Sequence, residues 1–412
     1  MKFAVLTFGC RTNEADSCRL ERDLAASGGT GARAEAADLV VVNTCTVTAA
    51  ADQAARQAIR RIARVNPTAR IVATGCYATR RPGELEALPG VVALVPNARK
   101  STIAAIRDGH LAGSQPPIGV AAPGMRGRTT YPLRVQTGCD QACSYCIVPS
   151  TRGPGRSVGM EEVRDEARRL SAAGFLEVVL TGVHLGAWGR DLSPSRTLAD
   201  LLLALDSVPG TVRFRLSSLE PMDCSPAVIE IVAGSPRFQP HFHLPLQHAS
   251  ERMLCAMRRP YTFAAYRRLA ERVRERVPNA AIGSDVVVGF PGERDEDMAE
   301  LEEYLPASPI THLHVFPYSA RPGTAAAAME PKVPGATIRA RAERLRAAGR
   351  ALTSRFEASH VGHVLDGLTL RDGTMVLTDN FLKISVPPGR RRNERVRVKV
   401  ESAAPLQGEV LP

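Results

Sequence analysis

Short apolar runs alternate with stretches of helical periodicity over most of this 412-residue chain. In the first 107 residues the runs are rich in Val, Leu and Ile, and they lie at 2–8, 38–43, 69–74 and 91–95. Such continuous runs are typical of strands buried on both faces, and their alternation with helices is typical of a parallel sheet. The pattern predicts an α/β fold that starts with an open parallel α/β domain at 1–110.

A second alternation follows a segment at 111–128 whose Gly, Pro, Ala and Ser content predicts a linker. Six further apolar runs lie at 131–136, 177–181, 212–216, 241–246, 281–288 and 311–317. Six β–α units are fewer than the eight of a complete barrel, so we expect an open (β/α)6 partial barrel at 129–335. Its active face should be the carboxyl ends of the strands.

The C-terminal part has a different pattern. A basic helix is expected at 336–356, and the short alternating segments at 365–370, 374–378, 381–386 and 394–400 predict a small antiparallel β-barrel at 357–412. One of its hairpins carries Arg390, Arg391, Arg392 and Arg395. This hairpin is either a solvated basic face or an RNA-binding surface. The net charge of +11 favours a polyanionic partner, and we expect RNA.

The chain has no run of eighteen apolar residues, and its first residues show no signal-peptide pattern. We therefore expect a cytoplasmic protein without a membrane partner. In such a protein, nine cysteines are better explained by metal ligation than by disulfides.

Three of these cysteines, Cys139, Cys143 and Cys146, lie within eight residues, just after the first predicted barrel strand. Three thiolates leave one position open on a metal centre that normally takes four ligands, so an iron–sulfur cubane here would keep one iron free for a cofactor or substrate. A structural zinc site would need a fourth protein ligand, and the neighbouring sequence offers no clear one.

Three more cysteines, Cys10, Cys45 and Cys76, each follow the carboxyl end of a predicted strand of the first domain. In a parallel sheet these ends meet at one edge, where ligands usually bind, which predicts a second three-thiolate site. The alternative for each cysteine is a buried, small apolar side chain. The glycines before Cys10 and Cys76 would let backbone approach a cluster closely.

The spacing C-x3-C-x-aromatic-C, with Tyr145 at the aromatic position, resembles the signature of radical S-adenosylmethionine (SAM) enzymes. The whole chain further resembles the methylthiotransferase branch of that superfamily. The matching stretches are Thr7–Asn13, Val42–Cys45, Thr74–Tyr77 and Cys146–Ser157.

This resemblance implies two [4Fe–4S] clusters and SAM as cofactors. The cluster on Cys139, Cys143 and Cys146 would bind and cleave SAM, with Tyr145 against its adenine. The cluster on Cys10, Cys45 and Cys76 would hold the sulfur that is methylated and then transferred. An adenine C2–H bond is out of reach of side-chain acid–base catalysis, so a cofactor must supply the difficult step. The family also has an RNA-binding TRAM domain at its C-terminal end.

Four stretches, 180–189, 216–221, 243–250 and 285–293, look most like the MtaB-type members of the family. They imply methylthiolation of C2 of N6-threonylcarbamoyladenosine (t6A) at position 37, in the anticodon stem-loop of tRNA. The alternatives are N6-isopentenyladenosine at that position, an aspartate of a ribosomal protein, or, in another class, a non-catalytic zinc protein that binds RNA. An electron donor such as flavodoxin or ferredoxin is expected, and the sulfur donor stays open.

Further site residues follow only from their motifs. SAM contacts are expected from Thr181, Gly182, Ser218, Glu220, Gln247 and Arg259, all near predicted strand ends. Arg259 would pair with the methionyl carboxylate, because a guanidinium binds a carboxylate with two hydrogen bonds. Polar residues at strand ends can also be simple caps. Arg152 and Arg156 would contact RNA phosphate or cofactor, with a salt bridge between the cluster loop and the barrel as the alternative.

Overall fold

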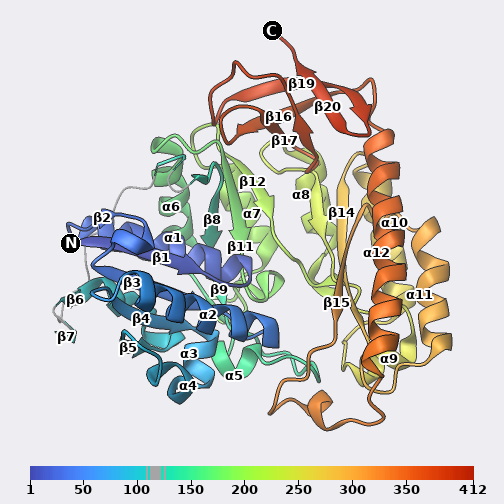
Figure 1. Cartoon of the computed structure of the whole chain (residues 1–412). Coiled ribbons are helices and arrows are strands. Elements are labelled where there is room, and N and C mark those ends of the chain that lie inside the picture. The colour runs from blue at the N-terminus through green and yellow to red at the C-terminus, as the bar shows by residue number, and fades with distance from the viewer. Residues whose placement is uncertain (108–109, 112–121, 125–126) are drawn as a thin grey trace.

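The computed structural model describes residues 1–107, 110–111, 122–124 and 127–412. An N-terminal sheet, a central partial barrel and a small C-terminal barrel follow one another along the chain (Figure 1). Most of the predicted linker, residues 112–121 and 125–126, lies outside the described residues, so the domain boundaries stay predictions.

The N-terminal sheet has five parallel strands in the order β2-β1-β3-β4-β5. The strands are β1 (Lys2–Thr7), β2 (Thr30–Gly31), β3 (Leu39–Thr44), β4 (Arg70–Gly75) and β5 (Val91–Val95). The helices are α1 (Arg11–Ala26), α2 (Ala49–Val65), α3 (Cys76–Arg80) and α4 (Pro82–Glu86). Val40 and Val41 are fully buried in different apolar clusters, one on each face of the sheet. The predicted open parallel domain is confirmed.

The partial barrel contains all six predicted strands, which run parallel in two sheets, β8-β11-β12 and β13-β14-β15. Parallel bridges from Phe214 to Phe238 and from Ser218 to His243 connect the two sheets. The strands are β8 (Tyr131–Arg134), β11 (Glu177–Thr181), β12 (Arg213–Leu216), β13 (His241–His243), β14 (Ala281–Val288) and β15 (His312–Pro317). The helices are α5 (Val148–Arg152), α6 (Met160–Ala172), α7 (Leu198–Asp206), α8 (Pro226–Gly234), α9 (Glu251–Ala256), α10 (Phe263–Arg276) and α11 (Asp295–Ala307). The short strands β9 (Gln136–Thr137) and β10 (Arg156–Ser157) form a hairpin around the cysteine loop.

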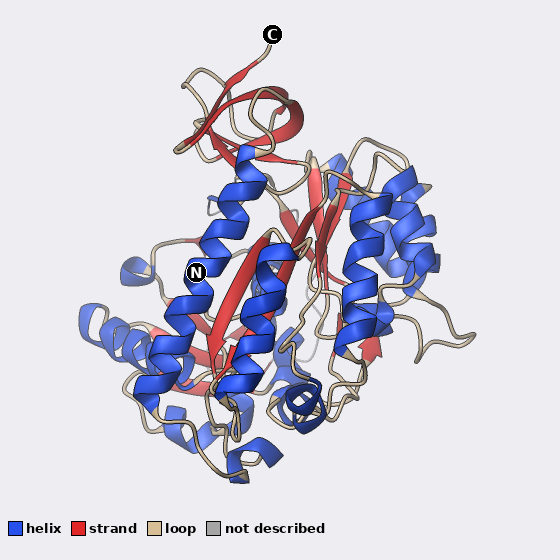
Figure 2. Cartoon of the chain, turned by 90° about the vertical axis from the view of Figure 1, so that its right-hand side faces the viewer, coloured by secondary structure: helices blue, strands red, loops and turns tan. Residues whose placement is uncertain are grey.

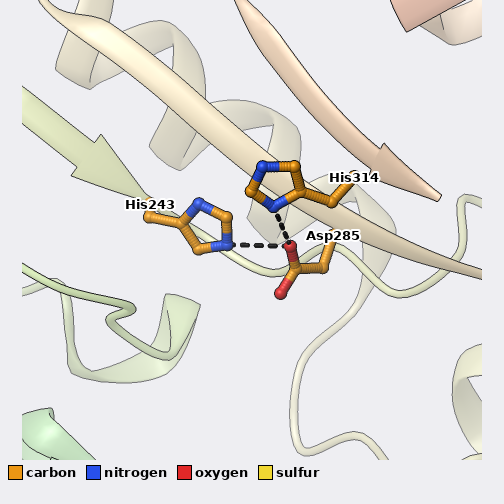
Figure 3. A group of neighbouring side chains, drawn as sticks. All are labelled: His243, Asp285 and His314. Carbon is orange, nitrogen blue, oxygen red and sulfur yellow. Dashed lines mark hydrogen bonds and ion pairs between the residues drawn. The ribbon is translucent and has the colours of Figure 1, made fainter. Parts of the chain in front are cut away.

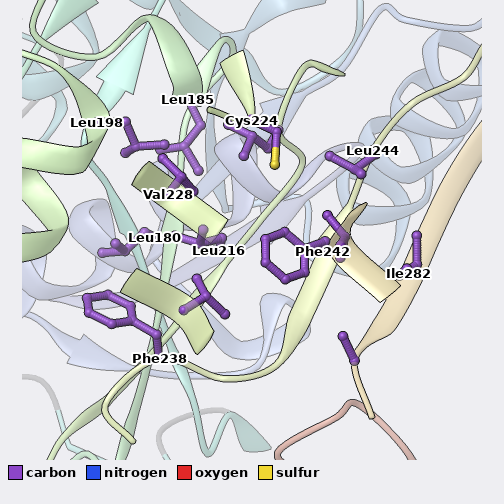
Figure 4. Close-up of a cluster of buried hydrophobic side chains, with 14 of the residues drawn as sticks. Leu180, Leu185, Leu198, Leu216, Cys224, Val228, Phe238, Phe242, Leu244 and Ile282 are labelled. Atoms are coloured by element: carbon purple, nitrogen blue, oxygen red, sulfur yellow. The ribbon is translucent and has the colours of Figure 1, made fainter. Parts of the chain in front are cut away.

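The two faces of the barrel strands differ in composition because successive side chains of a strand point to opposite sides. The inward-facing set includes the polar group His243, Asp285 and His314 (Figure 3). The outward-facing set packs on the helices and includes Phe242 and Ile282, which are fully buried with Leu180, Leu216 and Val228 (Figure 4). The near-continuous apolar runs of the sequence therefore did not predict that polar side chains line the barrel lumen.

The C-terminal barrel is closed and has the strand order β16-β17-β18-β20-β19. Its strands are β16 (Val364–Leu370), β17 (Met375–Thr378), β18 (Lys383–Ser385), β19 (Arg395–Ala403) and β20 (Leu406–Val410). The small barrel is confirmed, but the sequence reading missed β20. It was also wrong in making all pairs antiparallel, because β18 and β20 close the barrel as a parallel pair.

The small barrel caps the amino ends of the partial-barrel strands, at one end of the molecule (Figure 2). Arg215 of β12 pairs with Glu177 of β11 through two 2.9 Å bonds and donates to the carbonyls of Asp379 and Thr378 in the small barrel. The ring of Phe381 in the same loop packs on the His241 ring in a tilted arrangement, with the ring centroids 4.4 Å apart. The lumen is thereby closed at the end opposite the cysteine loop.

Helix α12 (Gly335–Ala358) runs along the partial barrel and leads into the small barrel (Figure 1). Part of its basic charge is neutralised within the chain, because Arg341 pairs with Glu293 and Arg344 with Glu302. Among the described residues, no helix is both long and apolar enough to cross a membrane.

Replacing Arg215 by Met should lower the free energy of unfolding by about 3–5 kcal/mol, because it leaves the buried Glu177 carboxylate without its cation. Arg213→Met is the matched control on the same strand, since Arg213 pairs with the exposed Asp366 and should cost only about 0–1 kcal/mol. Urea unfolding of both variants measures the difference, and equal losses would contradict this account of the junction.

Candidate active site

The loop between β9 and α5 holds Cys139, Cys143 and Cys146 at the carboxyl end of the first barrel strand. The Arg259 guanidinium donates a 3.1 Å hydrogen bond to the Cys143 sulfur. Burial raises the pKa of Cys146 to about 12, and the neighbouring sulfurs of Cys143 and Cys139 add to the rise. The three thiols therefore lie close enough to act on one another electrostatically.

The second set, Cys10, Cys45 and Cys76, lies at the carboxyl edge of the N-terminal sheet, after β1, β3 and β4. Burial is the main reason that the pKa of Cys45 is raised to about 12, and Cys10 and Cys76 contribute to this rise, so these three sulfurs are also neighbours. Cys10 is exposed, whereas Cys45 and Cys76 are buried. The predicted convergence of three strand ends is what the structure shows.

Glycines let the backbone come close to this second set. Gly9 and Gly75 precede Cys10 and Cys76 and have φ of +93° and +97°, a region that side-chain-bearing residues rarely adopt. A Cβ on Gly9 would lie 2.4 Å from the Cys45 sulfur. Any larger residue at position 9 would therefore displace a thiol of the set.

Both sets fit an iron–sulfur cluster better than a single zinc ion. Three thiolates on one zinc ion lie about 3.8 Å apart, given Zn–S bonds of about 2.3 Å in a tetrahedron. Among the described residues, the one group of three or more possible ligands whose atoms all lie within 4.8 Å is His243, Asp285 and His314, which contains no cysteine. The buried thiols would lose their protons on binding metal, because the thiolate is the ligand form.

One buried carboxylate connects the two cysteine sets. Asp16 of α1 lies 3.0 Å from the Arg152 guanidinium and 2.7 Å from the Lys100 ammonium, and Arg134 of β8 also pairs with it. Burial alone would raise the pKa of Asp16, but these three cations hold it well below its usual range. The N-terminal sheet is thereby fixed to the cysteine loop of the barrel.

This geometry corrects the prediction for Arg152. Its side chain is only 3% exposed, and it also donates to Asn13, so it does not reach a surface where RNA could bind. The salt-bridge alternative is what the structure shows. Asn97 adds a second link, since its amide donates to the Cys76 sulfur at 3.5 Å and to the Thr151 carbonyl at 3.0 Å. Arg156 is exposed, and its predicted RNA contact stays a prediction.

The expected SAM contacts fall into two groups. Tyr145, Glu220 and Arg259 lie together at the Cys143 sulfur, with the Tyr145 ring edge-on to Phe290 at 6.4 Å. Arg259 is paired with the Glu220 carboxylate, which occupies the position that the prediction gave to the methionyl carboxylate. A ligand carboxylate would have to compete with Glu220 for this guanidinium.

The remaining predicted contacts follow other strand ends. Thr181 is buried at the end of β11, and a Cβ on Gly182 would press on Gln136 at 3.1 Å. Ser218 is exposed beside His243, and Gln247 has φ of +67° with its backbone N–H bonded to the Asp285 carbonyl at 2.8 Å. These four residues lie at or just after strand ends of the barrel, and their SAM contacts stay predictions.

Sequence reasoning missed the partner of His184. The His184 imidazole lies 3.7 Å from the Cys139 sulfur and 2.5 Å from the Asp223 carboxylate. Burial alone would lower its pKa, but Asp223 and Cys139 raise it to about 9. With this raised pKa a protonated imidazole faces the Cys139 sulfur at neutral pH, and contacts of this kind tune the reduction potential of a cluster where one is bound. Asp223 ends the short 3-10 helix Pro221–Asp223, and no periodic signal in the sequence distinguishes it.

The predicted basic hairpin is wrong as a hairpin, because these arginines lie between β18 and the start of β19, two strands that do not pair with each other. The arginines are only partly free, and Arg390 donates to the Leu411 carbonyl at 3.3 Å. Arg390 and Arg391 are exposed, as predicted for an RNA surface. Arg392 donates to the Gly124 and Arg371 carbonyls, and Arg395 donates to the Thr211 and Leu176 carbonyls, so these two also hold the small barrel in place.

Comparison with known proteins matches the N-terminal sheet and the partial barrel to two different families. Residues 2–96 match the family described as Uncharacterized protein family UPF0004, and residues 133–305 match the Radical SAM superfamily. The Threonylcarbamoyladenosine tRNA methylthiotransferase MtaB of Aquifex aeolicus is 35% identical over 97% of this chain and 100% of its own length. The protein of the same name from Bacillus subtilis is 36% identical over 85% of this chain and 82% of its own.

This chain belongs to the radical SAM tRNA methylthiotransferase family. A tRNA-2-methylthio-N(6)-dimethylallyladenosine synthase of Chloroflexus aurantiacus is also similar, with 36% identity over 80% of this chain and 72% of its own length. Among solved structures, the radical SAM methyltransferase TsrM of Kitasatospora setae matches with a TM-score of 0.58 and 17% identity over 79% of this chain and 76% of its own. That likeness shows the fold alone.

The buried ion pairs of Asp16 should contribute to the stability of the protein. Asp16→Asn should lower the free energy of unfolding at pH 7 by about 3–5 kcal/mol, because three cations lose their buried carboxylate. A carboxyl group whose pKa is lower in the folded than in the unfolded protein stabilises the fold at pH values above its unfolded-state pKa, which is about 3.9 for aspartate. This stabilisation is lost as the pH falls below that value. The difference should therefore shrink by about 1 kcal/mol between pH 7 and pH 3.

Urea unfolding at both pH values measures this difference. Asp38→Asn is the control, because that carboxylate is at the surface and bonds only the backbone N–H of Lys2 among the described contacts. It should change stability by less than about 0.5 kcal/mol. A pH-independent loss in Asp16→Asn would show that the charge of Asp16 is not what stabilises the junction.

Proposed function

We propose that this enzyme methylthiolates C2 of t6A at position 37 of tRNA, with one [4Fe–4S] cluster on each cysteine set. The observation that carries the proposal is the link between the sets: Asp16 and Asn97 of the N-terminal part bond to Arg152 and Thr151, which follow the Cys139–Cys146 loop. A sulfur held at one set and a radical made at the other need such a fixed relation, because positioning within about 1 Å decides rates.

The cofactors would supply chemistry that side chains lack. A cluster on Cys139, Cys143 and Cys146 with SAM supplies a radical able to take the hydrogen from adenine C2, and a cluster on Cys10, Cys45 and Cys76 supplies the sulfur. The chain's own residues hold and orient these groups. Arg259 and protonated His184 donate toward the sulfurs of the first set, and Asn97 donates to that of Cys76.

The choice of t6A is supported by the relatives named for threonylcarbamoyladenosine, one of which matches over its whole length. Isopentenyladenosine is the second candidate, because the relative named as a dimethylallyladenosine synthase is equally identical, although over less of both chains. The exposed Arg390 and Arg391 would meet the tRNA backbone. We place the reaction in the cytoplasm, with a flavodoxin or ferredoxin as reductant and a sulfur donor still to be found.

A gain-of-function experiment tests the substrate. The chain is expressed in a bacterial strain that makes t6A and isopentenyladenosine but lacks both methylthiolating enzymes, and tRNA nucleosides are measured by mass spectrometry. We expect the 2-methylthio derivative of t6A to appear, and the Cys143→Ala variant to produce none. Appearance of only the isopentenyl product, or of neither product from a soluble, iron-loaded protein, would overturn the proposal.

A further inference from the structure

Three adjacent strands place a polar group in the barrel lumen. His243 of β13 and His314 of β15 both bond to one carboxylate oxygen of Asp285 on β14, at 2.9 and 3.0 Å (Figure 3). The His243 side chain is 12% exposed, Asp285 23% and His314 61%, so the group opens toward the His314 side. Burial alone would raise the pKa of Asp285, but the two histidines lower it to about 2, so the carboxylate is ionised at neutral pH and each imidazole donates to it.

Contacts of the neighbouring residues connect this group to the surroundings of both cysteine sets. Val287, two residues after Asp285 on the same face of β14, packs in the apolar cluster that Tyr145 of the SAM motif contacts. The Gln247 backbone N–H bonds to the Asp285 carbonyl, so the group lies directly beside a predicted SAM contact. Just after β15, Arg321 donates to Thr46, the residue that follows Cys45, so this side of the barrel faces the N-terminal part. Arg11 of that part also acts electrostatically on His314 and His241.

Arg11 is the residue next to Cys10, a ligand of the second set. Its side chain is exposed, and among the described residues it has no acidic partner. Arg11 begins α1 directly after Cys10, and it opposes the rise that Asp285 causes in the pKa of His314. A free cation therefore lies beside the expected sulfur-donating cluster, at the edge of the N-terminal sheet.

A metal ion is the obvious alternative ligand, since two histidines and one carboxylate can bind divalent iron or zinc. Two features weigh against it. Both ring nitrogens that point at Asp285 are already bonded to it, and the nearby Arg11 charge repels a cation. The same features favour an organic ligand that carries a negative charge and hydrogen-bonding groups.

We propose that this lumen group selects the substrate: Arg11 binds the carboxylate of the threonylcarbamoyl side chain, and His314 with Asp285 binds its hydroxyl and carbamoyl groups. His243 holds Asp285 in place. The inference rests on the proposed function and deepens it. The side chain branches from N6 on C6, and C6 and C2 flank N1 on the same edge of adenine, so C2 at the Cys10 set would bring the side chain toward the neighbouring Arg11. An isopentenyl group would leave these polar groups unpaired, which is how such sites reject apolar analogues.

The test uses the reconstituted full-length enzyme and three anticodon stem-loops that carry t6A, its methyl ester, or isopentenyladenosine. For the wild type, kcat/KM should fall about 10- to 100-fold from t6A to the ester, because a charge-assisted hydrogen bond is lost. With the t6A stem-loop, the kcat/KM of Arg11→Gln should lie below that of the wild type by about the same factor. With the ester, the kcat/KM values of Arg11→Gln and the wild type should differ little. For His314→Ala, kcat/KM should fall at least about tenfold with both the t6A stem-loop and the ester. Arg33→Gln and His363→Ala, exposed residues outside the lumen, serve as controls and should match the wild type.

Iron content and SAM cleavage without RNA show whether each variant keeps its clusters. If Arg11→Gln loses its iron, Arg11→Lys replaces it, and this variant should keep most of the preference for the acid over the ester. Inactivity of the wild type on the t6A stem-loop would sink the proposed function itself. Equal kcat/KM values of the wild type for acid and ester would overturn only this inference. The inference would also be overturned if the wild type bound a stoichiometric divalent metal other than iron and His314→Ala did not.

Discussion

A single buried carboxylate fixes the relation between the two halves of the active site. Asp16 sits on the first helix of the N-terminal sheet and is surrounded by Lys100 of that part and by Arg134 and Arg152 of the barrel. A buried charge is tolerated only when it is paired, so this carboxylate and its cations must assemble together. The two cysteine sets, each at the carboxyl edge of its own sheet, take their relative position from that contact.

The cysteine sets and most strands could be predicted from the sequence because they depend on local patterns. Apolar runs bounded by turn residues predicted all six barrel strands, and each cysteine's place after a strand predicted its edge. The burial of Arg152 could not be predicted in this way, because its partner Asp16 lies 136 positions away. The lumen group was also hidden, since only the register of β13, β14 and β15 brings His243, Asp285 and His314 together.

The two ends of the lumen serve different purposes. At the amino end, one buried ion pair between Arg215 and Glu177 and the ring of Phe381 close the barrel, which makes the small barrel a structural cap. It also presents Arg390 and Arg391 at the surface. At the carboxyl end, cysteines, Arg259 and His184 make a polar site that can hold cofactors. The family assignment fits this division, because radical chemistry needs an enclosed site and RNA needs an exposed basic one.

The central claim is that the two cysteine sets have separate roles in one reaction. Its most direct test measures 5′-deoxyadenosine and methylthiolated RNA from reconstituted Cys143→Ala and Cys45→Ala variants, with the exposed Cys255→Ala as control. The account predicts that Cys143→Ala forms neither product, whereas Cys45→Ala still forms 5′-deoxyadenosine but no methylthiolated RNA. Equal loss of both products in a folded Cys45→Ala protein, or methylthiolation that survives in it, would contradict the account.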